Sequence, residues 1–68
     1  MNSIRRAREA KGMSQEQLAA AVTENIADRV SQQAVAKWES GETNPRADKL
    51  VTIAKVLGVT VDELLKDE

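Results

Sequence analysis

A chain of 68 residues with one tryptophan and no phenylalanine or tyrosine is long enough for one small domain, spanning residues 1–68, and its composition disfavours a β-sandwich. It contains no cysteine and no histidine, which excludes disulfides and thiolate metal sites and argues against zinc binding and most acid–base enzymology. The net charge of −1 excludes an indiscriminately cationic nucleic-acid binder, although a local basic rim near the start of the chain is compatible with it.

The first predicted element is a helix that begins at Asn2 or Ser3 and continues to Lys11, with Gly12 as its stop. Its inner stripe, at helical spacing, consists of Ile4, Ala7 and Arg8. The cations free to face solvent are Arg5, Arg6 and Lys11. Solubility and phosphate contact are both open roles for these three side chains.

A second helix is predicted from residue 14, because the residues SQEQ at 14–17 have the form of a capping box with Ser14 as N-cap and Gln17 three residues on. Its inner face consists of Leu18, Ala19 and Val22. Gln15 lies in the first turn, where free backbone N–H groups and the positive end of the helix dipole suit a phosphate. A purely structural place in the cap is the alternative role of Gln15, and the two roles are compatible.

Residues 23–30, TENIADRV, have two interpretations. The i, i+4 rhythm of Leu18, Val22, Ile26 and Val30 would continue the second helix. Asn25 would instead end it, with a short extra turn starting at Thr23 or Asn25. We expect an extended or broken second helix, followed by a short loop into Ser31.

The third predicted helix follows Ser31, a good N-cap, and ends at Gly41, a good stop. Val35 and Trp38 point inward, and we place the tryptophan in the core rather than stacked on a base. The opposite side carries Gln32, Gln33, Ala36 and Lys37. A glutamine amide can donate and accept in one bidentate contact, which is how an adenine edge is read in the major groove. A solvated polar face is the alternative interpretation.

The remainder of the chain predicts two more helices. Residues 42–45 form a loop that ends in a proline, and a fourth helix runs from Arg46 or Ala47 to Leu57, with Gly58 as its stop. Its inward side chains are Leu50, Ile53, Ala54 and Leu57. Val59 enters the core, and Thr60 with Glu63 makes a second capping box. The fifth helix then holds Val61, Leu64 and Leu65.

These elements predict an all-α protein of five short helices, without strands or repeats. No apolar run is long enough for a membrane span, and the first twelve residues lack the apolar middle of a signal peptide. We therefore expect a cytoplasmic protein that does not associate with a membrane.

Four segments, GMSQEQLA, SQQAVAKWESG, NPR and LGVTVDELL, occur in that order. The ordered set resembles the lambda-repressor/Cro-like (Xre-type) DNA-binding family, which includes lambdoid phage repressors and Cro proteins, over residues from about 4 to 65. The resemblance implies a compact five-helix fold in which the second and third helices form a helix-turn-helix. It also implies a transcriptional repressor or regulator, of phage or prophage type, that binds a double-stranded DNA operator.

The resemblance assigns DNA contacts to individual residues. Base edges would be reached by Gln32, Gln33 and Lys37, although Lys37 fits a phosphate equally well, and Ala36 can at most touch a thymine methyl group. Gln15 would touch phosphate and brace Gln32. In total, the resemblance implies that six residues contact phosphate: Gln15, Ser14, Ser31, Thr43, Asn44 and Arg46. Such contacts hold register rather than read sequence.

Two further roles follow from the resemblance. Arg8 and Glu39 match a semi-buried ion pair between the first helix and the end of the third. A single domain offers a small interface, so we expect a homodimer on a palindromic operator. The last helix would supply its contacts, through Val61, Leu64 and Leu65, whose alternative role is the core.

The chain departs from the family between the second and third helices. Leu18 and Trp38 are twenty positions apart, about six more than the family pattern of this helix pair. Either the insertion loops out and leaves the helix pair unchanged, or the second helix lengthens and brings Arg29 near the DNA backbone.

A second hypothesis is an antitoxin-like or coactivator-like module that uses the same fold to bind a protein. The acidic tail favours it, with Asp62, Glu63, Asp67 and Glu68 in the last seven residues; the amides at the start of the third helix disfavour it. An enzyme has the least support, because no base–nucleophile pair is evident. We expect no metal, cofactor or small-molecule ligand. The sequence leaves open whether the chain is a complete Cro-like protein or the front end of a longer repressor.

Overall fold

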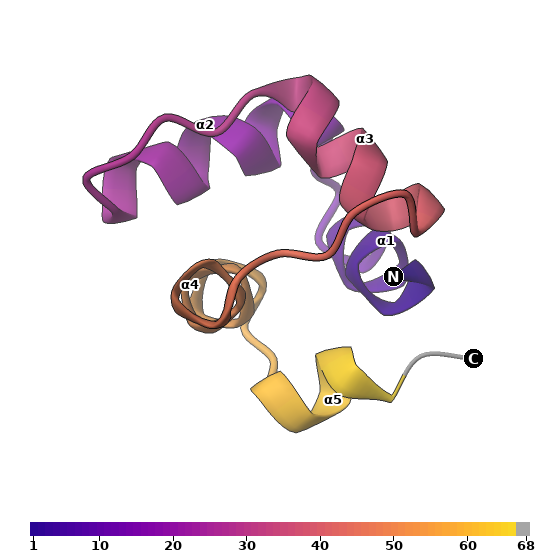
Figure 1. The fold of residues 1–68 in the computed structure, drawn as a ribbon. Helices are drawn as coiled ribbons and strands as arrows, with labels where there is room; N and C mark the ends of the chain where they lie inside the picture. The colour runs from indigo at the N-terminus through magenta and orange to yellow at the C-terminus, as the bar shows by residue number, and fades with distance from the viewer. Residues whose placement is uncertain (67–68) are drawn as a thin grey trace.

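Five helices make up the computed structural model, which describes residues 1–66. They are α1 (Asn2–Ala10), α2 (Gln15–Asn25), α3 (Gln32–Ser40), α4 (Ala47–Leu57) and α5 (Val61–Leu65) (Figure 1). No strand occurs in this part of the chain, so the predicted all-α class is confirmed. Asp67 and Glu68, half of the acidic tail noted above, lie outside the described residues.

Hydroxyl side chains start three of these helices where the sequence predicts them. Ser14 Oγ accepts from the Gln17 backbone N–H at 3.0 Å, and the Ser14 N–H donates to Gln17 Oε1 at 2.8 Å, which completes the capping box. Ser31 Oγ accepts from the Ala34 N–H at 3.1 Å. Thr60 Oγ1 accepts from the Glu63 N–H at 3.1 Å. The return bond from the exposed Glu63 side chain is absent among residues 1–66, so the second capping box is present in one direction only.

Glycine ends α3 and α4. Gly41 has φ 84° and Gly58 has φ 70°, both in the left-handed region that a side chain disfavours. The Gly41 N–H donates back to the carbonyls of Lys37 and Trp38. The chain therefore leaves α3 abruptly, and the loop 41–46 starts directly beside the last turn of that helix (Figure 1).

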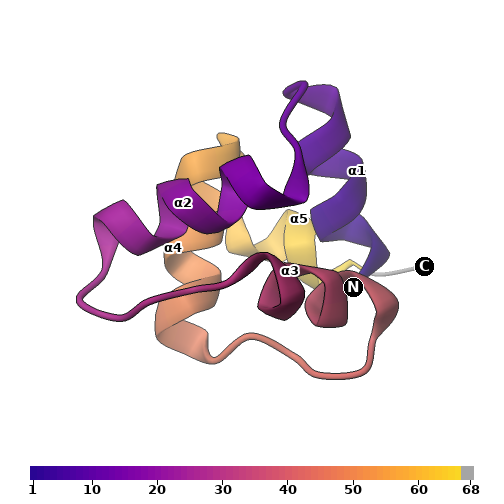
Figure 2. The ribbon, with the colours of Figure 1, turned by 90° about the horizontal axis from the view of Figure 1, so that it is seen from above.

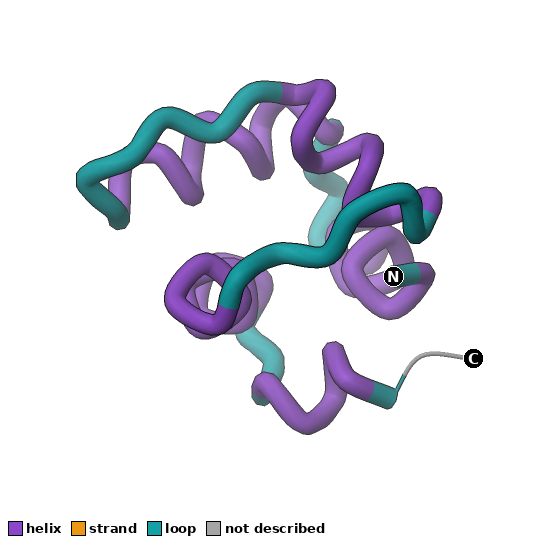
Figure 3. The backbone as a smooth tube through the Cα atoms, viewed as in Figure 1, coloured by secondary structure: helices purple, strands orange, loops and turns teal. Residues whose placement is uncertain are grey.

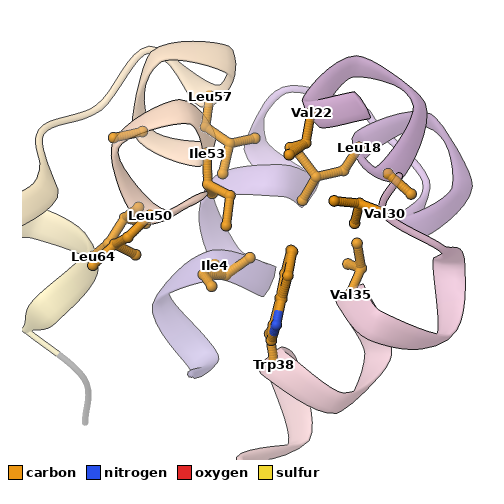
Figure 4. Close-up of a cluster of buried hydrophobic side chains, with 12 residues drawn as sticks. Ile4, Leu18, Val22, Val30, Val35, Trp38, Leu50, Ile53, Leu57 and Leu64 are labelled. Carbon is orange, nitrogen blue, oxygen red and sulfur yellow. The ribbon is translucent and has the colours of Figure 1, made fainter. Parts of the chain in front are cut away.

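One apolar cluster joins all five helices. Its buried members are Ile4, Leu18, Ala19, Val22, Val30, Val35, Trp38, Leu50, Ile53, Ala54, Leu57 and Leu64. Figure 4 shows the Trp38 ring projecting from α3 between Ile4 and Val35. Only 5% of Trp38 is exposed, so it anchors α3 in the core as predicted and has no free face for a base. Val59 is half-buried against the same cluster.

The packing holds α3 from two sides. α2 packs against α3 and α4, α1 packs against α3 and α5, and α4 packs against α5. Seen from above, α2 crosses over α4, with α3 below and to the side of it (Figure 2). α3 is thus fixed through α1 and α2 while its outer face remains uncovered.

The three apolar side chains of helix α5 differ in how far they are exposed. Leu64 is 1% exposed, Val61 is half-buried, and Leu65 is 58% exposed. Consecutive residues of a helix point about 100° apart, so Leu64 and Leu65 cannot both face inward from a five-residue helix.

Ser3 was not predicted to be buried, but its hydroxyl donates to the Leu64 carbonyl and ties α1 to α5.

None of the helices within residues 1–66 combines the length and the apolar character that crossing a bilayer requires.

Candidate nucleic-acid interface

The outer face of α3 carries the side chains predicted to read bases. Gln32, Gln33 and Lys37 are exposed and Ala36 is half-buried, while Val35 and Trp38 lie beneath them in the core. Gln33 and Lys37 are four residues apart and Gln32 and Ala36 likewise, so the four side chains form one continuous stripe. The insertion leaves both glutamines exposed to solvent. The stripe therefore presents two amides, one cation and one small apolar side chain.

The start of α2 lies beside this stripe and offers backbone donors. The N–H groups of Gln15 and Glu16 have no hydrogen-bond acceptor in the described part of the chain. The Ser14 hydroxyl accepts the capping bond, which leaves its own hydrogen to donate; the same holds for Ser31 at the start of α3. Two helix N-termini thus carry free donors of the kind that bind phosphate oxygens.

The side chain of Gln15 has a different partner from the one expected. Gln15 Nε2 donates to Glu39 Oε1 at 3.1 Å, so Gln15 braces the last turn of α3 and not Gln32 at its start. The physical reason is that Glu39 is a largely buried carboxylate, which needs more than one donor. The amide of Gln15 retains one further N–H for a phosphate.

Arg8 and Glu39 form a two-bond ion pair between α1 and α3. Arg8 Nε lies 2.6 Å from Glu39 Oε2, and Arg8 Nη2 lies 3.0 Å from Glu39 Oε1. Arg8 Nη1 also donates to the Met13 carbonyl at 2.8 Å. The side chains are 10% and 5% exposed. Arg8 therefore makes three hydrogen bonds inside the protein and occupies the place that the family resemblance implies for a structural ion pair.

The electrostatics of this pair favour the charged forms. The hydrogen bonds to Glu39 are the largest influence on Arg8 and raise its pKa, against burial, which lowers it. Burial is the largest single influence on Glu39 and raises its pKa. The hydrogen bonds from Arg8 and Gln15 and the charges of Arg8 and Arg5 outweigh it, so the pKa of Glu39 lies below its usual value.

The loop 41–46 carries the remaining predicted phosphate ligands. Thr43, Asn44 and Arg46 are all exposed. Arg46 occupies the N-cap position of α4. Its guanidinium makes no ion pair within residues 1–66. Lys37 Nζ lies 3.7 Å from Glu42 Oε2, with the two side chains 54% and 64% exposed. An ion pair this open is weak, and a phosphate or a guanine can replace it.

The insertion forms a loop, residues 26–31, that turns back from the end of α2 to the start of α3 (Figure 3). Of the two interpretations of residues 23–30, the structure shows the one in which Asn25 ends the second helix: α2 stops there, and the i, i+4 rhythm does not carry it on to Val30. Val30 keeps the buried position that the i, i+4 rhythm suggested, but it reaches the core from the loop. Thr23 makes this possible: the Val30 N–H donates to Thr23 Oγ1 at 2.9 Å. Sequence reasoning missed Thr23, although a hydroxyl in the last turns of a helix is a known partner for nearby backbone groups.

A family model described as helix-turn-helix matches residues 4–64. The chain belongs to the helix-turn-helix family. This confirms the resemblance to the lambda-repressor/Cro-like group and places the chain in a family of DNA-binding transcription regulators.

This helix-turn-helix chain is also similar to a curated relative, the HTH-type transcriptional activator BcrR of Enterococcus faecalis, with 40% identity over 65 residues. The match covers 96% of the chain and 29% of the relative, so the chain spans less than a third of that protein's length. No solved structure matches. The relative's name specifies an activator, so the expected repressor role receives no support from it.

Proposed function

We propose that this chain binds double-stranded DNA sequence-specifically by placing α3 in the major groove, and that it regulates transcription from that site. The observation that carries the proposal is the exposure of Gln32 and Gln33 on a helix whose other side is fixed by Trp38 and the Arg8–Glu39 pair. A glutamine amide held in place can grip an adenine edge through two hydrogen bonds, worth about 1–3 kcal/mol of discrimination.

The surrounding donors then hold the register. The free N–H groups at the start of α2, with the hydroxyls of Ser14 and Ser31, contact phosphates on one side of the groove. Thr43, Asn44 and Arg46 contact phosphates on the other side, from the loop 41–46. Lys37 gives up its exposed pairing with Glu42 and reaches either guanine or phosphate. Ala36 leaves space for a thymine methyl group.

We further propose that two copies bind a palindromic operator, with half-sites about one helical turn (34–36 Å) apart. Leu65 is the α5 side chain best suited to the dimer contact, because 58% of it is exposed, and half-buried Val61 can flank it. Leu64 is removed from the predicted dimer contacts. At 1% exposure it cannot touch a partner without leaving the core.

Selection from a random duplex pool, followed by titration of the selected site at several salt concentrations, tests this proposal. We expect a palindrome and a salt slope that corresponds to roughly 4–10 phosphate contacts per dimer. Failure to enrich any duplex would overturn the proposal and would favour the protein-interaction module. A reporter gene behind the selected site then gives the direction of regulation, activation or repression.

A further inference from the structure

The loop 26–31, which connects α2 and α3 where the chain is about six residues longer than the family pattern, presents three exposed residues between two apolar anchors. Val30 is 6% exposed and Ile26 is half-buried against the core. Ala27, Asp28 and Arg29 between them are exposed. Two apolar ends in the core hold the loop down at both sides and restrict the conformations open to the residues between them.

Polar contacts fix the loop further, from two helices. Thr23 Oγ1 accepts from the Val30 N–H at 2.9 Å, and the Thr23 hydroxyl lies 2.8 Å from the Ala19 carbonyl, to which it donates. Asp28 Oδ2 lies 3.3 Å from Lys49 Nζ of α4, whose side chain is only 19% exposed. The Asp28 side chain is itself 66% exposed, so this pair lies at the surface. Arg29 makes no ion pair within residues 1–66, so it is the unpaired charge of the loop.

Arg29 lies beside the start of α3. It lines an open groove of about 510 Å³ together with Ser31 and Gln32, and the first and last turns of α2 supply Glu16 and Glu24 to the same groove. The loop runs along α2 toward the start of α3 (Figures 2 and 3). The two acids would repel a phosphate, and among the described residues that line the groove Arg29 is the sole cation. Arg29 and Gln32 thus line the same open surface at the start of α3.

We infer that Arg29 contacts a DNA phosphate outside the base pairs read by Gln32 and Gln33, so that the insertion extends the footprint of each subunit. The inference rests on the proposed function. An exposed guanidinium on a loop held at both ends can bind a phosphate bidentately with little further ordering of the backbone. The contact adds affinity without changing base preference.

Arg29→Ala tests the inference, with Arg6→Ala as its matched control. Arg6 is exposed and lines a different groove, between α1 and α5, with Val59 and Leu64. Binding of the selected duplex and of a scrambled duplex is titrated at several salt concentrations. We expect Arg29→Ala to weaken binding of both duplexes by about tenfold at 0.1 M salt and to lower the salt slope by about 0.9 per subunit. No residue of α2 or α3 lines the groove that holds Arg6, so of its two open roles we expect solubility rather than phosphate contact, and Arg6→Ala should change neither quantity.

Ethylation interference locates the contact. One phosphate per half-site, outside the base pairs that the selection defines, should block the wild-type protein when ethylated and lose that effect in Arg29→Ala.

Thr23→Val keeps Arg29 but removes the hydroxyl that holds Val30. When Thr23→Val is already present, adding Arg29→Ala should weaken DNA binding by only about twofold to threefold. That loss is a fraction of what one complete phosphate contact contributes.

The outcomes separate the two proposals. If the wild-type chain binds its selected duplex and Arg29→Ala binds it with the same affinity and salt slope, the inference fails and the proposed function stands. If Arg29→Ala changes the preferred base at one position, Arg29 reads sequence and the phosphate contact is wrong. If the wild-type chain enriches no duplex, both proposals fail.

Discussion

Arg8 of α1 and Glu39 of α3 meet in a nearly buried ion pair, with nitrogen–oxygen distances of 2.6 and 3.0 Å. Gln15 of α2 adds a third bond to the same carboxylate. Three helices therefore converge on one side chain at the last turn of α3. Because Glu39 lies on α3 itself, this cluster sets how the helix is held against α1 and α2.

Removing one partner of the pair should strongly destabilise the fold. Arg8→Ala leaves the Glu39 carboxylate with Gln15 as its remaining side-chain donor, and we expect the free energy of unfolding to fall by about 3–5 kcal/mol. Urea denaturation followed by circular dichroism measures this loss.

Arg5→Ala is the matched control. Arg5 pairs with Glu9 at 3.2 Å, and the two side chains are 59% and 55% exposed. Such a surface pair contributes at most about 1 kcal/mol. Equal losses in the two variants would show that the Arg8–Glu39 pair is no stronger than a surface contact, which would contradict its structural role.

The same pair should give the protein an acid-sensitive component of stability. The folded-state pKa of Glu39 is depressed, so its contribution is complete above the ordinary glutamate pKa of about 4.3 and is lost as the pH falls through the folded-state value. Glu39→Gln cannot titrate, and its unfolding free energy should fall less steeply below about pH 4 than that of the wild type. Parallel pH profiles for the two proteins would contradict the assignment.

The exposed leucine of α5 should affect assembly without affecting the fold. Leu65→Asp places a charge on a side chain that is 58% exposed, so we expect a change in unfolding free energy of about 0.5 kcal/mol or less. If Leu65 lies in the dimer contact, binding to a two-half-site duplex should weaken strongly while binding to a single half-site is unchanged. Leu64→Asp, at a site 1% exposed, should unfold the protein. Wild-type affinity of Leu65→Asp for the full duplex would exclude α5 as the dimer surface.

Local signals in the sequence were sufficient for most of the fold. Ser14, Ser31 and Thr60 cap their helices, and Gly41 and Gly58 end two of them, because caps and left-handed stops depend on neighbours within one turn. The inward position of Trp38 follows in the same way from its spacing to Val35. The exposed stripe of α3 is the complement of that inner face.

Tertiary partners were not predictable from the same signals. Gln15 bonds to Glu39 because folding brings a buried carboxylate beside it, and nothing within one turn of Gln15 indicates that contact. Thr23 and Val30 are seven positions apart and meet because the chain reverses between them. The i, i+4 rhythm suggested a continuous helix through Val30. The spacing of apolar residues indicates which side chains are buried, but a buried valine can belong to a helix or to a loop.

Comparison of the base preferences of the wild type and Gln33→Ala tests the central claim, that α3 reads DNA through its outward amides, most directly. Both proteins are selected against the same random duplex pool, and Arg46→Ala is included as a phosphate-contact control that should weaken all sequences alike. We predict that Gln33→Ala relaxes the preference at one position of each half-site, at a cost of about 1–3 kcal/mol, and leaves the other positions intact. An unchanged preference at every position in Gln33→Ala would contradict the claim.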